Sequence, residues 1–155
     1  MQHYALKTDV SAERSKAELE ELLRLYGASA VASGWTDGHA FLAFTLCERT
    51  VRLRVPMPST SDFSHTESGR RRGARRQQQA FEQAYRARWR ALLLVVRAKL
   101  EACSIGITSL EREFLADLAL PEGRTVGDVL SADLARALSE PFTLRLLPAH
   151  ETGQA

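Results

Sequence analysis

The residues of this sequence best suited to bind a ligand are arginines that gather in one stretch of the chain. Between positions 70 and 99, ten basic residues stand against a single acidic one, Glu82. Five arginines lie close together at the start of the stretch: Arg70, Arg71, Arg72, Arg75 and Arg76. Three more recur at helical spacing: Arg86, Arg90 and Arg97. Clustered guanidinium groups neutralise phosphates and release counterions, so the pattern predicts salt-dependent binding to nucleic acid with little sequence preference.

A solvated basic surface is the alternative interpretation of the same cluster. Eighteen of the 21 basic residues are arginine, a bias that a GC-rich genome also produces. Runs of charge are often simply solvated. The clustering of the arginines, and not their abundance, therefore favours the nucleic-acid hypothesis.

Residues for catalysis are few. Asp62, His65 and Glu67 lie close together in DFSHTE and are of the types that bind a metal or exchange protons. Such a site needs rigid ligands, and the surrounding stretch is typical of a soluble loop. Cys47 and Cys103 form neither a disulfide framework nor a zinc site, and we expect Cys47 to be a small buried residue. No phosphate loop or dinucleotide fingerprint is present, so the sequence predicts a protein that is not an enzyme and has no cofactor.

Composition indicates an ordinary globular protein of one domain over residues 1–155. Hydrophobic residues make up 45% of the chain and charged residues 26%. No apolar run is long enough to cross a membrane, and the first residues do not read as a signal peptide, so we expect a cytoplasmic protein. Residues 1–69 sum to a charge of −2 and residues 100–155 to −5. The acidic last third is a candidate surface for a protein partner.

The first 56 residues predict one helix and three strands. Ser11 is a suitable N-cap for a helix over residues 12–26, and Gly27 would end it. Alternating or continuous apolar patterns predict three strands: residues 29–35, 39–46 and 50–55. In the last strand Arg52 and Arg54 fall on the outward-facing side.

The remainder predicts a loop and helices. Residues 57–75 are rich in serine, glycine and charge, and we expect a mobile basic loop. A long helix follows over about residues 76–102, within a helical part that extends to 138. Two capping-box patterns, Thr108 with Glu111 and Thr125 with Asp128, predict two further helices. Residues 139–155 predict an irregular tail. The predicted fold class is therefore α+β.

The order helix, three strands, helix resembles the double-stranded-RNA-binding domain, which recognises a duplex by its shape. That module uses a histidine in the loop between its first two strands and basic residues at the start of its second helix. Asp37-Gly38-His39 occupies the first of these places, and Arg72, Arg75 and Arg76 occupy the second. The long loop and the additional helices depart from that pattern. Trp35, beside the same turn, is expected in the core with Trp89, or stacked on a base or a partner.

Two stretches, VSAERSKAELEELLRLYGA and QAYRARWRALLLVVRAKLEACSIGITSLEREFLADLALPEGRTVGDV, resemble small proteins of tailed phages and prophages of high-GC bacteria. That resemblance implies a phage origin, action in the host cytoplasm and a role during infection. Such proteins commonly serve DNA replication or recombination, or inhibit host systems. It assigns no reaction and no functional residue.

Two functions remain open from the sequence. The first is a nucleic-acid-binding phage protein without enzymatic activity, in which the arginines neutralise phosphates and His39 helps to read shape. The second is a protein-interaction module that binds or inhibits a host or phage protein, as a monomer or as a homo-oligomer.

Overall fold

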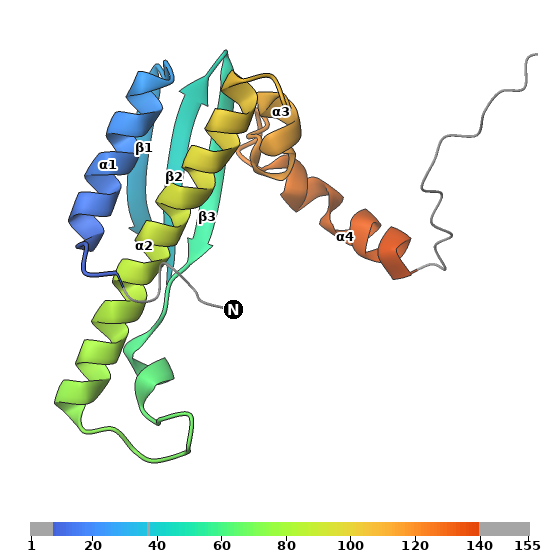
Figure 1. Ribbon diagram of the computed structural model, residues 1–155. Coiled ribbons are helices and arrows are strands. Elements are labelled where there is room, and N and C mark those ends of the chain that lie inside the picture. Colours follow the sequence, from blue (N-terminus) through green and yellow to red (C-terminus); the bar gives the residue numbers. More distant parts are fainter. Residues whose placement is uncertain (1–7, 37, 140–155) are drawn as a thin grey trace, which may run out of the picture.

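The computed structural model describes residues 8–36 and 38–139. It confirms the α+β class (Figure 1). The principal elements are α1 (Ala12–Leu25), β1 (Ala30–Thr36), β2 (His39–Leu46), β3 (Arg49–Pro56) and α2 (Ala74–Ser104). Four short elements complete it: η2 (Thr60–Phe63), α3 (Leu110–Glu113), η3 (Leu115–Asp117) and α4 (Val126–Ser139). The predicted tail, apart from Ser139, and Asp37 of the first turn lie outside the described residues.

Helix α1 begins where the sequence predicts and ends at Leu25, one residue before the predicted end. The Ser11 hydroxyl accepts a hydrogen bond from the amide of Arg14 at 3.1 Å and so satisfies a first-turn donor. Gly27 adopts a φ of 88°, a left-handed conformation that ends helices. Between them, Leu19 and Leu23 are buried against the sheet.

The three strands form an antiparallel sheet with β2 in the centre. Leu46 pairs with Arg49, so β2 and β3 are joined by only two residues, Cys47 and Glu48, and both have positive φ. This is the geometry of a tight hairpin turn, which asparagine and glycine adopt more easily. Cys47 is exposed there. The expectation that it would be buried is wrong because the turn carries its side chain away from the core.

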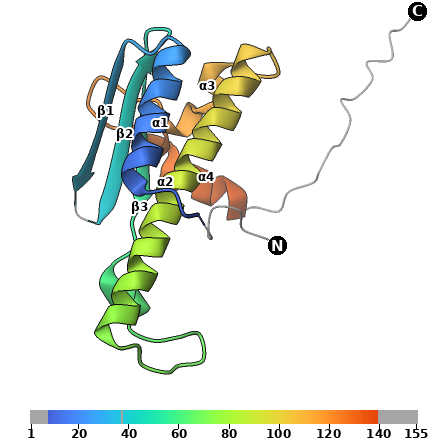
Figure 2. The same cartoon turned by 60° about the vertical axis from the view of Figure 1, so that its left-hand side comes forward.

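One face of the sheet carries the core. Helices α1 and α2 lie side by side on it, as Figure 2 shows. Leu42 and Phe44 of β2 pack there with Trp89 and Leu93 of α2. The opposite face of the sheet, which we call the outer face, carries the alternate residues of the strands, including Arg52 and Arg54.

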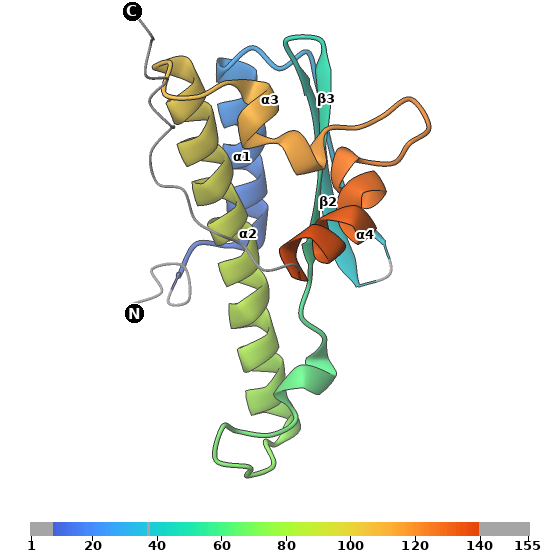
Figure 3. The ribbon, with the colours of Figure 1, turned by 90° about the vertical axis from the view of Figure 1, so that its right-hand side faces the viewer.

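Helix α2 is longer than the sheet that it packs on. It begins at Ala74, two residues before the predicted start, and ends at Ser104. At 1.5 Å per residue its 31 residues span about 46 Å. Its buried residues all lie between Ala87 and Leu100. The first part of the helix therefore projects beyond the sheet, as Figures 1 and 3 show.

The C-terminal elements wrap around the β3 edge of the sheet. Helix α3 is capped by Ser109, one residue later than the predicted Thr108. Phe114 then packs edge to face on Phe44, with ring centroids 5.6 Å apart. The Ala119 amide donates to the Thr50 carbonyl at 2.8 Å, and the chain crosses to the outer face, where α4 lies (Figure 3). No helix among the described residues is long and apolar enough to cross a membrane.

Candidate nucleic-acid interface

The projecting part of α2 and the segment that leads to it form one substructure, residues 57–86, which we call the arm. Its connecting segment contains the 3-10 helix η2, closed by a capping box between Ser59 and Asp62. The Gln77 side chain of α2 donates to the carbonyl of Thr60 at 2.7 Å. The segment predicted as a mobile loop is thus hydrogen-bonded to the helix in this structure, and its mobility in solution stays a prediction.

The arginines at the tip of the arm are free to meet a ligand. Arg70, Arg71, Arg75 and Arg76 are exposed, and none of them forms an ion pair with another described residue. Arg72 differs, because its guanidinium donates to the backbone carbonyls of Phe63 and His65 and braces the segment. Among residues 8–36 and 38–139, four arginines without an ion-pair partner therefore lie together at the tip of the arm.

The start of α2 adds to this positive end. Its N-cap, Gly73, offers no side chain to the first-turn amides, and that turn contains no acidic residue. Unsatisfied amides at a helix N-terminus favour anions. The backbone and the side chains of the arm tip thus have the same electrostatic preference.

The expected stripe of arginines further along α2 is interrupted. Arg90 Nη1 lies 2.7 Å from Glu18 Oε2 of α1, and its side chain is only 19% exposed. Burial raises the pKa of Glu18, but hydrogen bonds from Arg90 and Arg14 outweigh it and hold that pKa below its ordinary value. Arg90 is consequently engaged within the protein, by a carboxylate that it shares with Arg14.

The other two arginines of that stripe differ from each other. Arg86 is half-buried, donates to Gln83 at 2.7 Å, and its Nε has no hydrogen-bond partner among the described residues. Arg97 is exposed on the far half of the helix. The helical spacing is as predicted, but α1 packs beside this face and supplies Glu18, which the spacing alone does not reveal.

Aromatic residues hold the base of the arm. The rings of Trp35 and Tyr85 lie 6.2 Å apart, and those of Tyr85 and Phe81 lie 6.0 Å apart. The Lys16 ammonium sits over the Trp89 ring at 4.6 Å. Trp89 belongs to the core as expected, whereas Trp35 is 53% exposed. Trp35 therefore links the end of β1 to α2 while leaving part of its ring in solvent.

His39 lies at the root of the arm and not at the tip of a loop. Gly38 adopts a φ of 74°, and its carbonyl accepts from the amide of Met57, the first residue of the arm, at 2.9 Å. His39 is the first residue of β2, half-buried on the outer face. The structure thus brings the predicted histidine and the start of the arm together.

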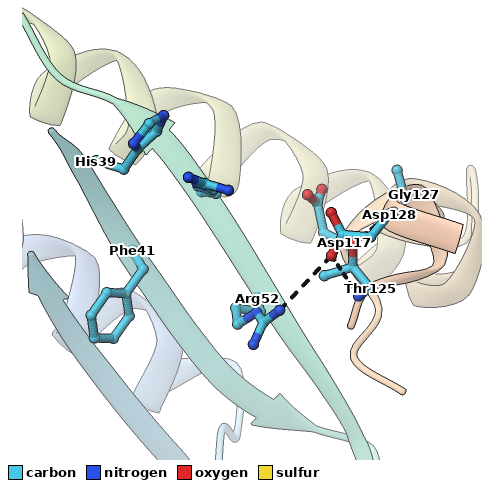
Figure 4. Close-up of a pocket in the computed structure, with 9 residues that line it drawn as sticks. His39, Phe41, Arg52, Asp117, Thr125, Gly127 and Asp128 are labelled. Atoms are coloured by element: carbon cyan, nitrogen blue, oxygen red, sulfur yellow. Dashed lines mark hydrogen bonds and ion pairs between the residues drawn. The ribbon is translucent and has the colours of Figure 1, made fainter. Parts of the chain in front are cut away.

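A groove of about 620 Å³ lies on the outer face, between the strands and the η3–α4 segment. Figure 4 shows His39, Phe41 and Arg52 on the strand side and Asp117 and Asp128 on the helical side. Exposed Arg54 also lines it and forms no ion pair with a described residue.

The two carboxylates of the groove have opposite pKa shifts. The backbone amide of Thr125 and then its hydroxyl hold the pKa of Asp128 below its ordinary value, and Arg52 at 3.9 Å acts in the same direction. These contacts also confirm the capping box predicted for Thr125 and Asp128. Burial raises the pKa of Asp117, against the opposing effect of Lys99.

The residues proposed from the sequence for catalysis do not converge. The Asp62 carboxylate accepts from the Ser59 amide at 2.8 Å, and His65 Nδ1 lies 3.0 Å from the Ser64 hydroxyl. Within residues 8–36 and 38–139, no three His, Cys, Asp or Glu side chains are placed to hold a metal ion. The carboxylate of Asp62 has a structural role in the arm.

The sequence reasoning missed the groove. The alternation in β3 places Arg52 and Arg54 outward, which was the available signal. The alternation in β3 does not predict that Phe41 of the neighbouring strand lies beside these two arginines, or that α4 forms the opposing wall of the groove.

Comparison of this chain with known protein families, with curated proteins and with solved structures gives no match. The choice of a function therefore depends on the chemistry of the arm and of the groove.

Proposed function

We propose that this protein binds nucleic acid through its arm, in the cytoplasm and without catalysing a reaction. The observation that supports the proposal is the set of four exposed arginines, without an ion-pair partner in the described part of the chain, beside a helix N-terminus with no side-chain cap. Phosphates are the anions that such a surface suits, because guanidinium groups bind phosphate oxygens in bidentate fashion. Arg75 and Arg76 lie on α2, whose other half is rooted in the core, so the backbone at these two positions is ordered before a ligand binds, which lowers the entropy lost on binding.

Salt dependence tests the proposal. If four phosphates are neutralised on a duplex, the logarithm of affinity falls with the logarithm of salt concentration at a slope of about −3.6. Affinity measured by fluorescence anisotropy should then fall roughly 150-fold between about 50 and 200 mM salt. Binding that is absent at low salt, or that is indifferent to salt, contradicts the proposal.

A matched pair of variants locates the interface. The arm variant replaces four arginines by glutamine: Arg70, Arg71, Arg75 and Arg76. The control variant removes the same charge from exposed arginines elsewhere: Arg14, Arg24, Arg112 and Arg136. We expect the arm variant to flatten the salt slope and to weaken low-salt binding by more than about ten-fold. Equal losses in both variants would show that only net charge matters.

A place in phage biology is part of the proposal. The resemblance of two long stretches to small phage proteins suggests replication or recombination of phage DNA as the setting. Binding that is independent of sequence suits such work, because the protein must follow a template of any composition. Arrest of phage DNA synthesis in cells infected with a mutant that lacks only the arm arginines would support this setting.

A protein-interaction role is the second candidate, and one feature of α4 favours it. Val129, Leu130 and Leu134 are 44%, 47% and 58% exposed. Exposed apolar side chains on one helix are typical of a protein contact. A partner retained after nuclease treatment by the native chain, and lost with Leu130→Glu and Leu134→Glu, would favour this role over the first.

A further inference from the structure

The groove on the outer face has the composition of a site for a single nucleotide. Its two walls differ in chemistry: the strands contribute cations and an aromatic ring, and the η3–α4 segment contributes carboxylates. Its volume of about 620 Å³ falls in the range of small-molecule sites. Each part of a nucleotide has a counterpart among these groups.

The helical wall is held close to the sheet. The Val126 amide donates to the Leu118 carbonyl at 3.0 Å, and Leu118 itself bridges to Val51 of β3. At Gly127 a side chain would lie 2.8 Å from the backbone oxygen of Ala116, so only glycine permits this approach. The groove is thus set by backbone contacts.

The strand wall offers cations that a phosphate can engage. Arg54 has no ion-pair partner among the described residues. Arg52 meets Asp128 only at 3.9 Å, with both side chains more than 40% exposed, and such pairs contribute little. A phosphate bound by Arg54 is therefore also within the reach of a cation that is only weakly engaged, Arg52.

The floor of the groove offers a ring for stacking. Phe41 is half-buried and lies over Gly34 of the neighbouring strand, where a Cβ would come within 2.4 Å of the ring. Because Gly34 has no side chain, the Phe41 ring can lie against the backbone of β1 at this position. Figure 4 shows the ring on the strand side, away from Asp117 and Asp128. Bases of single strands stack on aromatic side chains in this way.

The opposite wall offers acceptors. Asp117 is half-buried, and its carboxylate makes no hydrogen bond or ion pair with another described residue. Carboxylates accept hydrogen bonds from the amino groups of bases and repel phosphates. A nucleotide would therefore lie with its phosphate toward Arg54 and its base edge toward Asp117.

We propose that this groove binds one unpaired nucleotide of a single-stranded nucleic acid whose more distant phosphates contact the arginines at the tip of the arm. The inference rests on the proposed function and specifies its substrate as single-stranded. His39 lines the groove, and the neighbouring Gly38 is hydrogen-bonded to Met57, so the groove lies at the root of the arm, and a strand that occupies both surfaces must run along the arm to the arginines at its tip. A base inside a duplex cannot present its face to Phe41, so a duplex would use the arm alone.

The test compares a labelled single strand with a duplex of the same length, on the full chain. Phe41→Leu keeps an apolar group over Gly34 and removes the stacking ring, and Arg54→Gln removes one cation. Arg49→Gln is the charge-matched control, since Arg49 pairs with Glu111 outside the groove. We expect each groove variant to weaken single-strand binding about five-fold or more and to leave duplex binding unchanged.

The outcomes separate this inference from the proposed function. If the arm variant loses binding and the groove variants bind the single strand like the native chain, the groove inference is wrong and the arm proposal stands. If the arm variant binds as well as the native chain, the arm proposal fails.

A second measurement isolates the nucleotide. Titration with a nucleoside 5′-monophosphate should shift the NMR amide signals of Gly34 and Arg54, whereas inorganic phosphate should not shift Gly34. Equal effects of both on Gly34 would show an anion site without stacking and would overturn the inference. DNA and RNA single strands, compared in the labelled-strand binding assay, show whether the groove prefers deoxyribose or ribose.

Discussion

The contact between Gly34 and Phe41 permits a quantitative test of how the groove is built. The two residues are direct partners in the β1–β2 register. A Cβ placed on Gly34 would lie 2.4 Å from Cζ and 2.5 Å from Cε1 of the Phe41 ring. Carbon atoms pack at about 3.5–4.0 Å, so Gly34→Ala forces the ring to move by about 1 Å or more.

The expected cost follows from two opposing effects. Overpacking of this kind costs about 1–3 kcal/mol. Alanine is otherwise better than glycine in a strand by about 0.5–1 kcal/mol. Gly34→Ala should therefore destabilise the native chain by up to about 2.5 kcal/mol, with a central value of about 1 kcal/mol, and lower Tm by up to about 10 °C. In a Phe41→Ala background the clash is absent, so the same substitution should stabilise by about 0.5–1 kcal/mol.

A double-mutant cycle measured by denaturant unfolding checks this reasoning. We expect a coupling of about 2 kcal/mol between the two positions. Gly38→Ala is the control, because Gly38 has a positive φ and a Cβ added there would meet no atom within 4 Å. Its cost is therefore backbone strain and should not depend on Phe41. A coupling between Gly34 and Phe41 below about 0.5 kcal/mol would refute the proposed ring position.

Three further perturbations test other parts of the structure. Glu18→Gln should lower the free energy of unfolding by about 1 kcal/mol at neutral pH, because it leaves half-buried Arg90 unpaired. Since the folded pKa of Glu18 is lowered, the difference in unfolding free energy between the native chain and the variant should shrink as pH falls through that pKa, which an acid-unfolding series measures. Cys47→Asn with Glu48→Gly should stabilise by about 1–2 kcal/mol in thermal unfolding, since both positions have positive φ. Asp117→Asn should stabilise the protein at neutral pH, because burial raises the folded pKa of Asp117 and the ionised carboxylate is therefore unfavourable in the folded state. The gain in unfolding free energy should disappear below the ordinary aspartate pKa, and an equal gain at every pH would show that burial of the charge is not the cause.

Local patterns predicted the elements well because each depends on neighbouring residues. The Ser11 cap, the Gly27 stop and the capping box of Thr125 and Asp128 all formed as expected. Errors in element bounds were small, as at Ser109, where two adjacent hydroxyls both suit a cap, but the short helix η2 and the exposure of Cys47 were not predicted. The fold class followed from the order of these elements.

The sites were harder to predict because they depend on contacts between distant segments. Helical spacing placed Arg90 on a polar face, but Glu18, 72 residues earlier in the chain, determines that it is engaged within the protein. Strand alternation turned Arg54 outward, but the groove exists only because the chain after Leu118 crosses the sheet edge. The local periodicity of the sequence predicts neither the pairing of Arg90 with Glu18 nor the crossing of the sheet edge.

The asymmetry of α2 connects the fold to both surfaces. Starting a helix is costly and extending it is not, so the half between Ala87 and Leu100, fixed in the core, can propagate outward into solvent. The hydrogen bond from Gln77 to the η2 segment then ties the extension back to the chain. Arg75 and Arg76 therefore lie on a helix that is anchored in the core, and Arg70 and Arg71 lie in the segment that is tied back to it. The other end of the arm is fixed at Met57, whose amide donates to Gly38 beside the groove, so under the proposed function a strand bound at the tip reaches the groove by running along α2.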